Sequence, residues 1–166
     1  MTLPAVFVVM GVSGSGKTTI AGLLAEQLGW EFKDADDFHS PENVAKMRGG
    51  TALTDEDRWP WLRSVAAWID ATRDGGHGAL ACPALKRAHR DILIGDRADV
   101  RLVYLRGSRE LIARRQAART GHYMPASLMD SQFDILQEPG PDETPVVVSV
   151  EPAPPQIVQD ILGAVA

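Results

Sequence analysis

A glycine-rich segment near the amino end constrains this chain more than any other feature. Residues 11–18 read GVSGSGKT and satisfy the pattern G-x-x-x-x-G-K-[ST] in full. An apolar, valine-rich run over residues 5–10 predicts a strand before the segment, and apolar residues at helical spacing over 20–28 predict a helix after it. A strand, a glycine turn and a helix in this order form a cup of inward-facing backbone amides that binds phosphate.

Each residue type in this loop has a physical role in binding phosphate. Glycines let the backbone amides turn inward, and the start of the helix adds partial positive charge. Lys17 is expected to reach the β- and γ-phosphates of a nucleotide, and the Thr18 hydroxyl is expected to ligate Mg²⁺. The predicted nucleotide-binding residues of the loop are Gly11, Ser13, Gly14, Ser15, Gly16, Lys17, Thr18 and Thr19.

An acidic cluster, Asp34-Ala35-Asp36-Asp37, follows a second predicted strand at residues 31–33. The carboxyl ends of parallel strands line the ligand crevice, so these carboxylates are expected to face the outermost phosphate. One carboxylate would hold a metal-bound water and another would accept the proton of an attacking hydroxyl. We assign Asp34 to the metal and Asp36 to the proton, although the sequence leaves the two roles interchangeable. An isolated acidic pair would otherwise indicate a solvated turn.

The remaining pattern alternates strands with helices. Further strands are predicted over residues 78–82, 100–105 and 145–150, with helices over 109–118 and 157–165. Such alternation is typical of an α/β fold with a parallel sheet and helices on both faces. Residues 38–60 and 119–127 fit the alternation poorly, as inserts that form substrate-binding flaps do.

Composition excludes several other classes of protein. A chain of 166 residues with 45% hydrophobic residues is expected to form one domain with a real core, here taken as residues 1–166. The single cysteine, Cys82, rules out a disulfide framework and favours a reducing, cytoplasmic location. The net charge of −5 argues against nucleic acid as a partner, and no apolar run is long enough for a membrane span.

Four blocks of sequence resemble the gluconokinases of the small P-loop type, which are related to shikimate kinase and the nucleoside monophosphate kinases. The resemblance covers about residues 5–150, and the three later blocks are far more specific than the loop alone. Two positions depart from the usual family pattern, which has glycine where Ala35 stands and serine where Pro83 stands. The blocks are MGVSGSGKT at 10–18, DADDFH with NVAKM at 34–47, LTDEDRWPWL at 53–62, and CPALKRAHRD with QF and LQEP at 82–139.

This resemblance implies ATP-dependent transfer of a phosphoryl group to the 6-hydroxyl of D-gluconate. It implies a three-layer fold around a five-stranded parallel sheet. It also implies a helical substrate-binding insert near residues 38–73, a mobile lid near 115–127 and, more weakly, a homodimer. Substrate and cofactors would be gluconate, ATP and Mg²⁺.

Several side chains take expected roles from this resemblance. Gluconate would contact Asp36, and Arg58 suits its carboxylate because a guanidinium fork pairs well with carboxylate oxygens. The other expected gluconate contacts are His39, Lys86 and Arg90. Arg115 and Arg119 in the lid would close on the phosphates, with Arg119 acting in the transfer step, and Gln137 would border the adenine site. Ordinary structural or solvated roles remain the alternative for the histidine and the basic residues.

Two other classes of function remain open at this level. A related small-molecule kinase could act on another sugar acid, on shikimate or on a nucleotide. A regulator could bind nucleotide without turnover, although the intact Lys17, Thr18, Asp34 and Asp36 argue against it.

Overall fold

The fold is built on a single all-parallel sheet. The computed structural model describes residues 3–118 and 126–165, and the sheet it contains has the strand order β2-β3-β1-β4-β5. Its five strands confirm the predicted fold class. The strands are β1 (Val6–Met10), β2 (Glu31–Asp34), β3 (Gly78–Ala81), β4 (Val100–Arg106) and β5 (Val146–Ser149).

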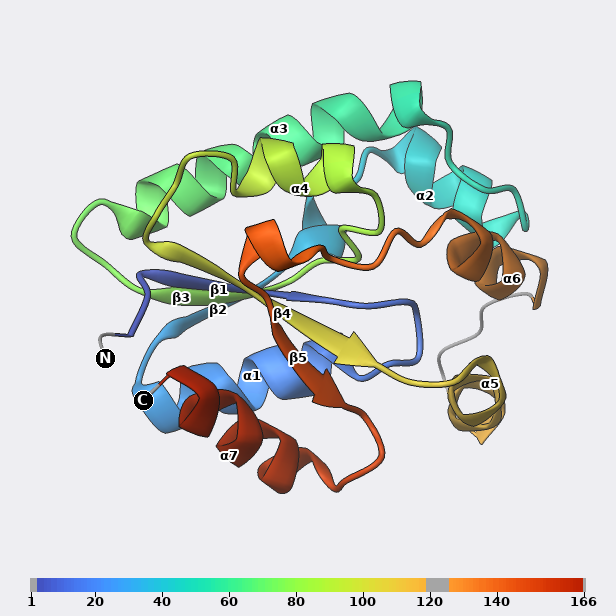
Figure 1. The fold of residues 1–166 in the computed structure, drawn as a ribbon. Helices are drawn as coiled ribbons and strands as arrows, with labels where there is room; N and C mark the ends of the chain where they lie inside the picture. Colours follow the sequence, from blue (N-terminus) through green and yellow to red (C-terminus); the bar gives the residue numbers. More distant parts are fainter. Residues whose placement is uncertain (1–2, 119–125, 166) are drawn as a thin grey trace.

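Helices cover both faces of the sheet, as Figure 1 shows. One layer holds α3 and α4 and the opposite layer holds α1 and α7, while α2, α5 and α6 lie beyond the carboxyl ends of the strands. The helices are α1 (Lys17–Leu28), α2 (Pro41–Arg48), α3 (Asp55–Arg73), α4 (Arg87–Leu93), α5 (Arg109–Ala118), α6 (Ala126–Ile135) and α7 (Pro154–Val165). Two short 3₁₀ turns, η1 (Ala35–Phe38) and η2 (Pro141–Glu143), complete the elements.

The central strand β1 is fully buried because both of its faces pack against helices. Phe7 and Val9 belong to the core shared with α1 and α7, whereas Val8 and Met10 belong to the core shared with α3. This two-sided burial explains why the strand is a continuous apolar run rather than an alternating one. The rigid strand holds the loop that follows it at a fixed place above the sheet edge.

Side-chain caps mark the starts of α2 and α3. Ser40 Oγ accepts from the Asn43 amide at 3.2 Å and begins α2. Thr54 Oγ1 accepts from the Asp57 amide at 3.1 Å, while Asp57 Oδ2 accepts from the Thr54 amide at 2.9 Å. This reciprocal capping box fixes where α3 begins, and so fixes the first-turn residue Arg58.

The expected lid is only partly described. Helix α5 ends at Ala118 and α6 begins at Ala126, so Arg119 lies outside the described residues. In the described part of the chain, no helix is long and apolar enough to cross a membrane.

Candidate active site

The glycine-rich loop places open backbone amides at the start of α1. Gly14 and Gly16 have φ angles of +86° and +96°, in the left-handed region that favours glycine. A Cβ at Gly14 would also lie 2.8 Å from Oε1 of Gln116. Among the described residues no side chain caps α1. Its first amides therefore remain available to an anionic ligand.

Thr18 and Asp34 meet across the carboxyl edge of the sheet. The Thr18 hydroxyl donates to Asp34 Oδ2 at 3.0 Å, and Asp34 Oδ1 accepts from the Asp36 amide at 2.9 Å. The structure thus brings together the two predicted metal ligands from β2 and α1. Within the described ranges no cluster of three His, Cys, Asp or Glu side chains could hold a metal by itself. A hydroxyl and one carboxylate suit a cation that takes its other ligands from phosphates and water, as Mg²⁺ does.

Asp36 lies just beyond this pair, and its side chain is 68% exposed. It lines both of the cavities described below. Enclosure by the walls of the site and the charge of Asp34 raise the pKa of Asp36, and Lys17 opposes the shift. A carboxylate with a raised pKa is a stronger base, which suits a group that accepts a proton.

Two cavities meet at this point. The outer cleft is large enough for a nucleotide and follows the loop toward the end of β5. The inner cavity lies between the loop and the helices α2, α3, α4 and α6. Among the described residues, three line both cavities, namely Ser13, Lys17 and Asp36. A group moving from one cavity to the other must therefore pass the lysine and the carboxylate.

His39 and Trp61 form one wall of the inner cavity. Their rings stack with centroids 4.1 Å apart, and Trp61 Nε1 donates to the Ala35 carbonyl at 2.7 Å. The His39 side chain is 3% exposed, with Nε2 3.9 Å from Asp36 Oδ1. Burial and the nearby charge of Arg58 lower the pKa of His39 to about 4. The imidazole is therefore neutral near pH 7, so it acts as a hydrogen-bonding group and not as a cation.

Arg58 supplies positive charge to the same cavity. Its side chain is 14% exposed, and the Asp55 carboxylate lies 3.8 Å from Nη1. Burial lowers the pKa of Arg58, but an arginine stays protonated at any physiological pH. Because that carboxylate lies beyond hydrogen-bond distance, the guanidinium is well suited to an incoming anion.

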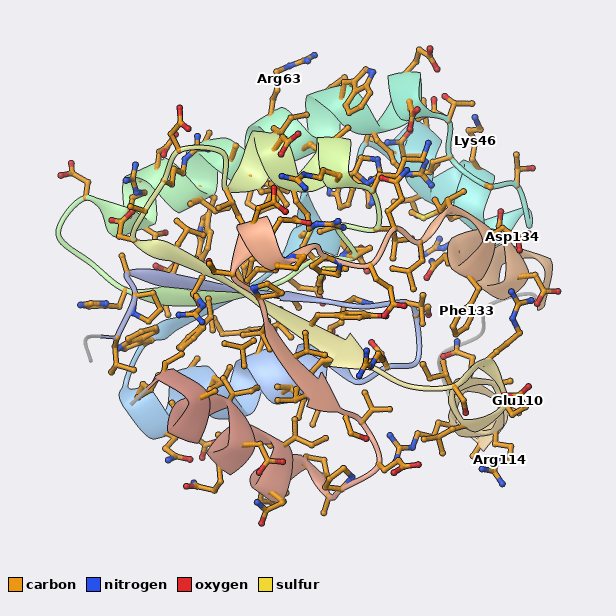
Figure 2. The ribbon with its side chains drawn as sticks, in the orientation of Figure 1. Lys46, Arg63, Glu110, Arg114, Phe133 and Asp134 are labelled. Atoms are coloured by element: carbon orange, nitrogen blue, oxygen red, sulfur yellow. The ribbon has the colours of Figure 1, made fainter. Side chains whose placement is uncertain are left out.

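Helix α6 closes the inner cavity from the side of the loop. Gln132 Oε1 accepts from the Ser13 amide at 2.6 Å, and Ile135 adds apolar surface. Phe133 points from α6 toward α5 (Figure 2), where the Arg109 guanidinium lies 5.0 Å from its ring centroid. Arg109 also pairs with Asp130 at 3.1 Å. These contacts hold α6 against α5 and thus place Gln132 over the phosphate loop.

Two basic residues expected to contact substrate are placed elsewhere. The Lys86 ammonium donates to both Asp55 oxygens at 3.1 Å, joining the starts of α3 and α4. The Arg90 side chain is 2% exposed and pairs with Glu143 at 2.6 Å. It also donates to the carbonyls of residues 84 and 85. Neither residue lines the inner cavity, so the structure does not bring them together with His39 and Arg58.

The residue expected to border the adenine site lies away from the outer cleft. Gln137 Oε1 accepts from the Arg87 amide at 2.8 Å, and Gln137 does not line the outer cleft. The cleft is bordered instead by residues 151–154, which the sequence reading did not single out. Arg115 does line it, and its guanidinium donates to the Val150 carbonyl at 2.5 Å. No sequence motif marks the 151–154 segment, because its position depends on the packing of α7 beside β5.

The residues of the inner cavity that were not predicted include Trp61, His89 and Gln132. Trp61 is 5% exposed and belongs to the core shared with α3, and it also lines the cavity. The other two belong to sequence blocks that carry the family resemblance, which is the only signal that could have indicated them.

Comparison with known proteins agrees with this geometry. The AAA domain family matches residues 6–139. The chain is 46% identical over 160 residues to the gluconokinase of Gluconobacter oxydans (strain 621H), covering 96% of this chain and 90% of that protein. The unliganded crystal structure of a sugar kinase from Janibacter sp. HTCC2649 superposes with a TM-score of 0.90 at 49% identity, covering 96% and 93% of the two chains.

A gluconokinase from Sinorhizobium meliloti 1021 superposes with a TM-score of 0.89 at 38% identity, over 98% of this chain and 92% of that one. The similarity therefore extends over the loop, the inserted helices and the sheet together. The chain belongs to the gluconokinase family of P-loop kinases.

Proposed function

We propose that this protein transfers the γ-phosphoryl group of ATP to the 6-hydroxyl of D-gluconate, giving 6-phospho-D-gluconate and ADP. The observation that carries the proposal is the meeting of the two cavities at Ser13, Lys17 and Asp36. A nucleotide in the outer cleft would present its last phosphate to an acceptor in the inner cavity. The family relationship supports gluconate as that acceptor.

The transfer itself follows from the charges at the junction. The acceptor oxygen forms a bond to the γ-phosphorus, the bond from that phosphorus to the oxygen of ADP breaks, and Asp36 takes the proton of the hydroxyl. Lys17 and the amides at the start of α1 stabilise negative charge on the phosphates during the step. The position of Asp36 in the walls of both cavities supports this role, because the base has to reach the hydroxyl that attacks the phosphate.

We infer that Mg²⁺ binds with the nucleotide. Thr18 and Asp34 would hold it, directly or through water, and their oxygens are the ligands this cation prefers. When bound, Mg²⁺ neutralises phosphate charge and orients the terminal phosphate.

Recognition of gluconate is assigned to the inner cavity. Arg58 pairs with the carboxylate and neutral His39 hydrogen-bonds a hydroxyl, while Arg115, and Arg119 from the lid, act on the phosphates. The segments 38–73 and 115–127 serve as acceptor-binding insert and lid of a single domain. We place the reaction in the cytoplasm, where the Cys82 thiol stays reduced; a homodimer is expected only from the resemblance.

An acceptor screen tests the proposal. ADP release is coupled to a detection reaction with gluconate, shikimate and nucleoside monophosphates as acceptors, each with and without Mg²⁺. Gluconate should give the highest kcat/KM, and omission of Mg²⁺ should abolish turnover. A higher kcat/KM with shikimate or a nucleotide would reassign the acceptor. Tight ATP binding with no turnover on any acceptor would indicate a nucleotide-binding regulator.

A further inference from the structure

A histidine outside the expected set of site residues lines the inner cavity and has a buried ring nitrogen with no hydrogen-bond partner among the described residues. His89 lies in the first turn of α4, and its side chain is 2% exposed. It lines the same cavity as His39 and Arg58. No role was assigned to it above, because a single histidine in a helix carries no pattern of its own.

The protonated ring nitrogen can be assigned from the local hydrogen bonds. Nδ1 lies 3.3 Å from the Lys86 backbone nitrogen, which can only donate. Nδ1 therefore accepts, and in a neutral ring the proton is on Nε2. Burial and the charge of Arg58 lower the pKa of His89 to about 4, so the neutral form is the one present near pH 7.

Nε2 then lacks a partner. It is a buried atom with no hydrogen-bond partner among the described residues. The nearest carboxylate oxygen, Asp55 Oδ1, lies 3.7 Å away and already accepts from Lys86 at 3.1 Å. A buried donor without an acceptor costs about 1–3 kcal/mol. Such a group in a cavity wall is retained most readily where a ligand supplies the missing acceptor.

The surrounding charges indicate which end of the acceptor His89 faces. His39 Nε2 lies 3.9 Å from Asp36 Oδ1, at the junction of the two cavities, whereas His89 Nε2 lies 3.7 Å from Asp55 Oδ1, the carboxylate oxygen that Arg58 approaches to 3.8 Å. His39 therefore lies on the side of the phosphate junction, and His89 lies at the Arg58 end of the cavity. An acceptor whose hydroxyl reaches Asp36 would extend its other end toward Arg58 and His89.

We propose that the His89 Nε2–H donates a hydrogen bond to the carboxylate end of the acceptor and is, with Arg58, a determinant of specificity for sugar acids. This inference rests on the proposed function, because it takes a polyhydroxy acid as the acceptor. The donor is uncharged, so it adds direction to the attraction that Arg58 provides. It favours an acceptor oxygen over a methylene or an alcohol donor at the same place.

Two substitutions separate the ligand contact from the helix cap. His89→Asn keeps an acceptor near the Nδ1 position for the Lys86 amide but has no donor at the Nε2 position. His89→Gln carries an amide nitrogen that reaches the Nε2 position. His77→Asn is the matched control, since the His77 ring is stacked on Trp30 and does not line either cavity.

The expected result is a rise of about tenfold or more in the KM for gluconate in His89→Asn, the effect of one lost hydrogen bond to a charged group. The KM for ATP and kcat should change far less, and His89→Gln should recover most of the loss. Comparison of gluconate with glucitol, which has no carboxylate, should show a much smaller effect of His89→Asn on glucitol.

Three outcomes would overturn the inference. They are an unchanged gluconate KM in His89→Asn, an equal loss in the Asn and Gln variants, and an equal effect on gluconate and glucitol. If the Asn variant fails to fold, the Gln variant provides the test. The inference predicts that His89→Gln keeps the wild-type preference for gluconate over glucitol, and loss of that preference would contradict it. An enzyme with no activity on gluconate would contradict the proposed function itself and not the role of His89 alone.

Discussion

The chemistry of the site depends on the Asp36 carboxyl group. Its surroundings favour the protonated form, so the carboxylate accepts a proton readily. Enclosure and the charge of Asp34 raise the pKa of Asp36, while Lys17, which lines the same junction, keeps the carboxylate form accessible. The sequence predicted these three residues because they follow the ends of β1 and β2, where the topology of parallel strands brings side chains together.

Asp36→Asn should lower kcat by about 100- to 10,000-fold, the usual contribution of a general base. Binding of a nonhydrolysable ATP analogue should change little, because the P-loop amides and Lys17 are retained. The activity of the wild type should rise with pH, and the midpoint of this rise should lie at a higher pH than the pKa of an ordinary aspartate, because the pKa of Asp36 is raised. Steady-state kinetics from pH 4.5 to 8 measure kcat of the variant and the midpoint for the wild type. A loss of ATP affinity with unchanged kcat would reassign Asp36 to nucleotide binding.

Lys17→Ala should lower kcat by roughly a thousandfold or more, because the charge that stabilises the transferring phosphate is lost. The fold should survive, since Lys17 lies in the phosphate-binding loop at the junction of the two cavities and is not part of the apolar core. Thermal unfolding provides the control, and Lys33→Ala, at a half-buried position on β2 that lines neither cavity, serves as a matched variant. Near-normal turnover in Lys17→Ala would remove the loop from the mechanism.

Other residues could not be predicted, because their partners lie far away in sequence. Lys86 and Arg90 are four residues apart at the start of α4 and share one face of it. That spacing does not indicate which groups they contact. The structure supplies Glu143, 53 residues beyond Arg90, and Asp55, 31 residues before Lys86. His89 gave no signal either, since its unpartnered nitrogen exists only once α4 is packed.

At the scale of elements, the helix starts were the most predictable features. The Thr54 capping box and the Ser40 cap are encoded within four residues, so local sequence determines them. The position of α6 over the loop was not predictable, because it depends on the contacts of Arg109 and Gln132 between separate elements.

The buried pair of Arg90 and Glu143 is expected to be structural. Glu143→Leu should lower the free energy of unfolding by about 3 kcal/mol, because it leaves a buried guanidinium without its counter-charge. Arg90→Met combined with Glu143→Leu should recover most of this loss, as measured by urea unfolding. If Arg90 contacted the acceptor instead, Arg90→Met would raise the gluconate KM and leave stability nearly unchanged.

For the whole molecule, the alternation of strands and helices predicted the parallel sheet and its two covering layers. It did not predict the strand order, because a right-handed crossover can step over one neighbour or more. The observed order inserts β3 between β1 and β2, so the loop and the acidic cluster stand two strands apart. That separation is bridged by the hydrogen bond from Thr18 to Asp34.

Two buried histidines should make the whole fold sensitive to acid. The pKa values of His39 and His89 are both lowered to about 4, so between pH 6.5 and 4 the unfolded chain binds more protons than the native one. The free energy of unfolding should therefore fall as pH drops through that window, by up to roughly 3 kcal/mol for each histidine. Urea unfolding at pH 7.5, 6, 5 and 4.5 measures the slope. His39→Gln should flatten it, and a wild-type slope near zero would contradict the assignment of neutral rings.

The two cavities draw their walls from different parts of the architecture, and this has a consequence for how such enzymes diversify. The outer cleft is lined by the phosphate loop, the end of β2 and parts of α1, α5 and α7, whereas the inner cavity is lined largely by residues of α2, α3, α4 and α6 and of the loops that join them to the strands. The acceptor and the phosphate donor are thus recognised by different segments. Exchanging the segments that line the inner cavity for those of another phosphotransferase should change which acceptor is phosphorylated and leave the phosphate donor the same. Such a chimera would take its acceptor specificity from the exchanged helices and would keep ATP as its phosphate donor.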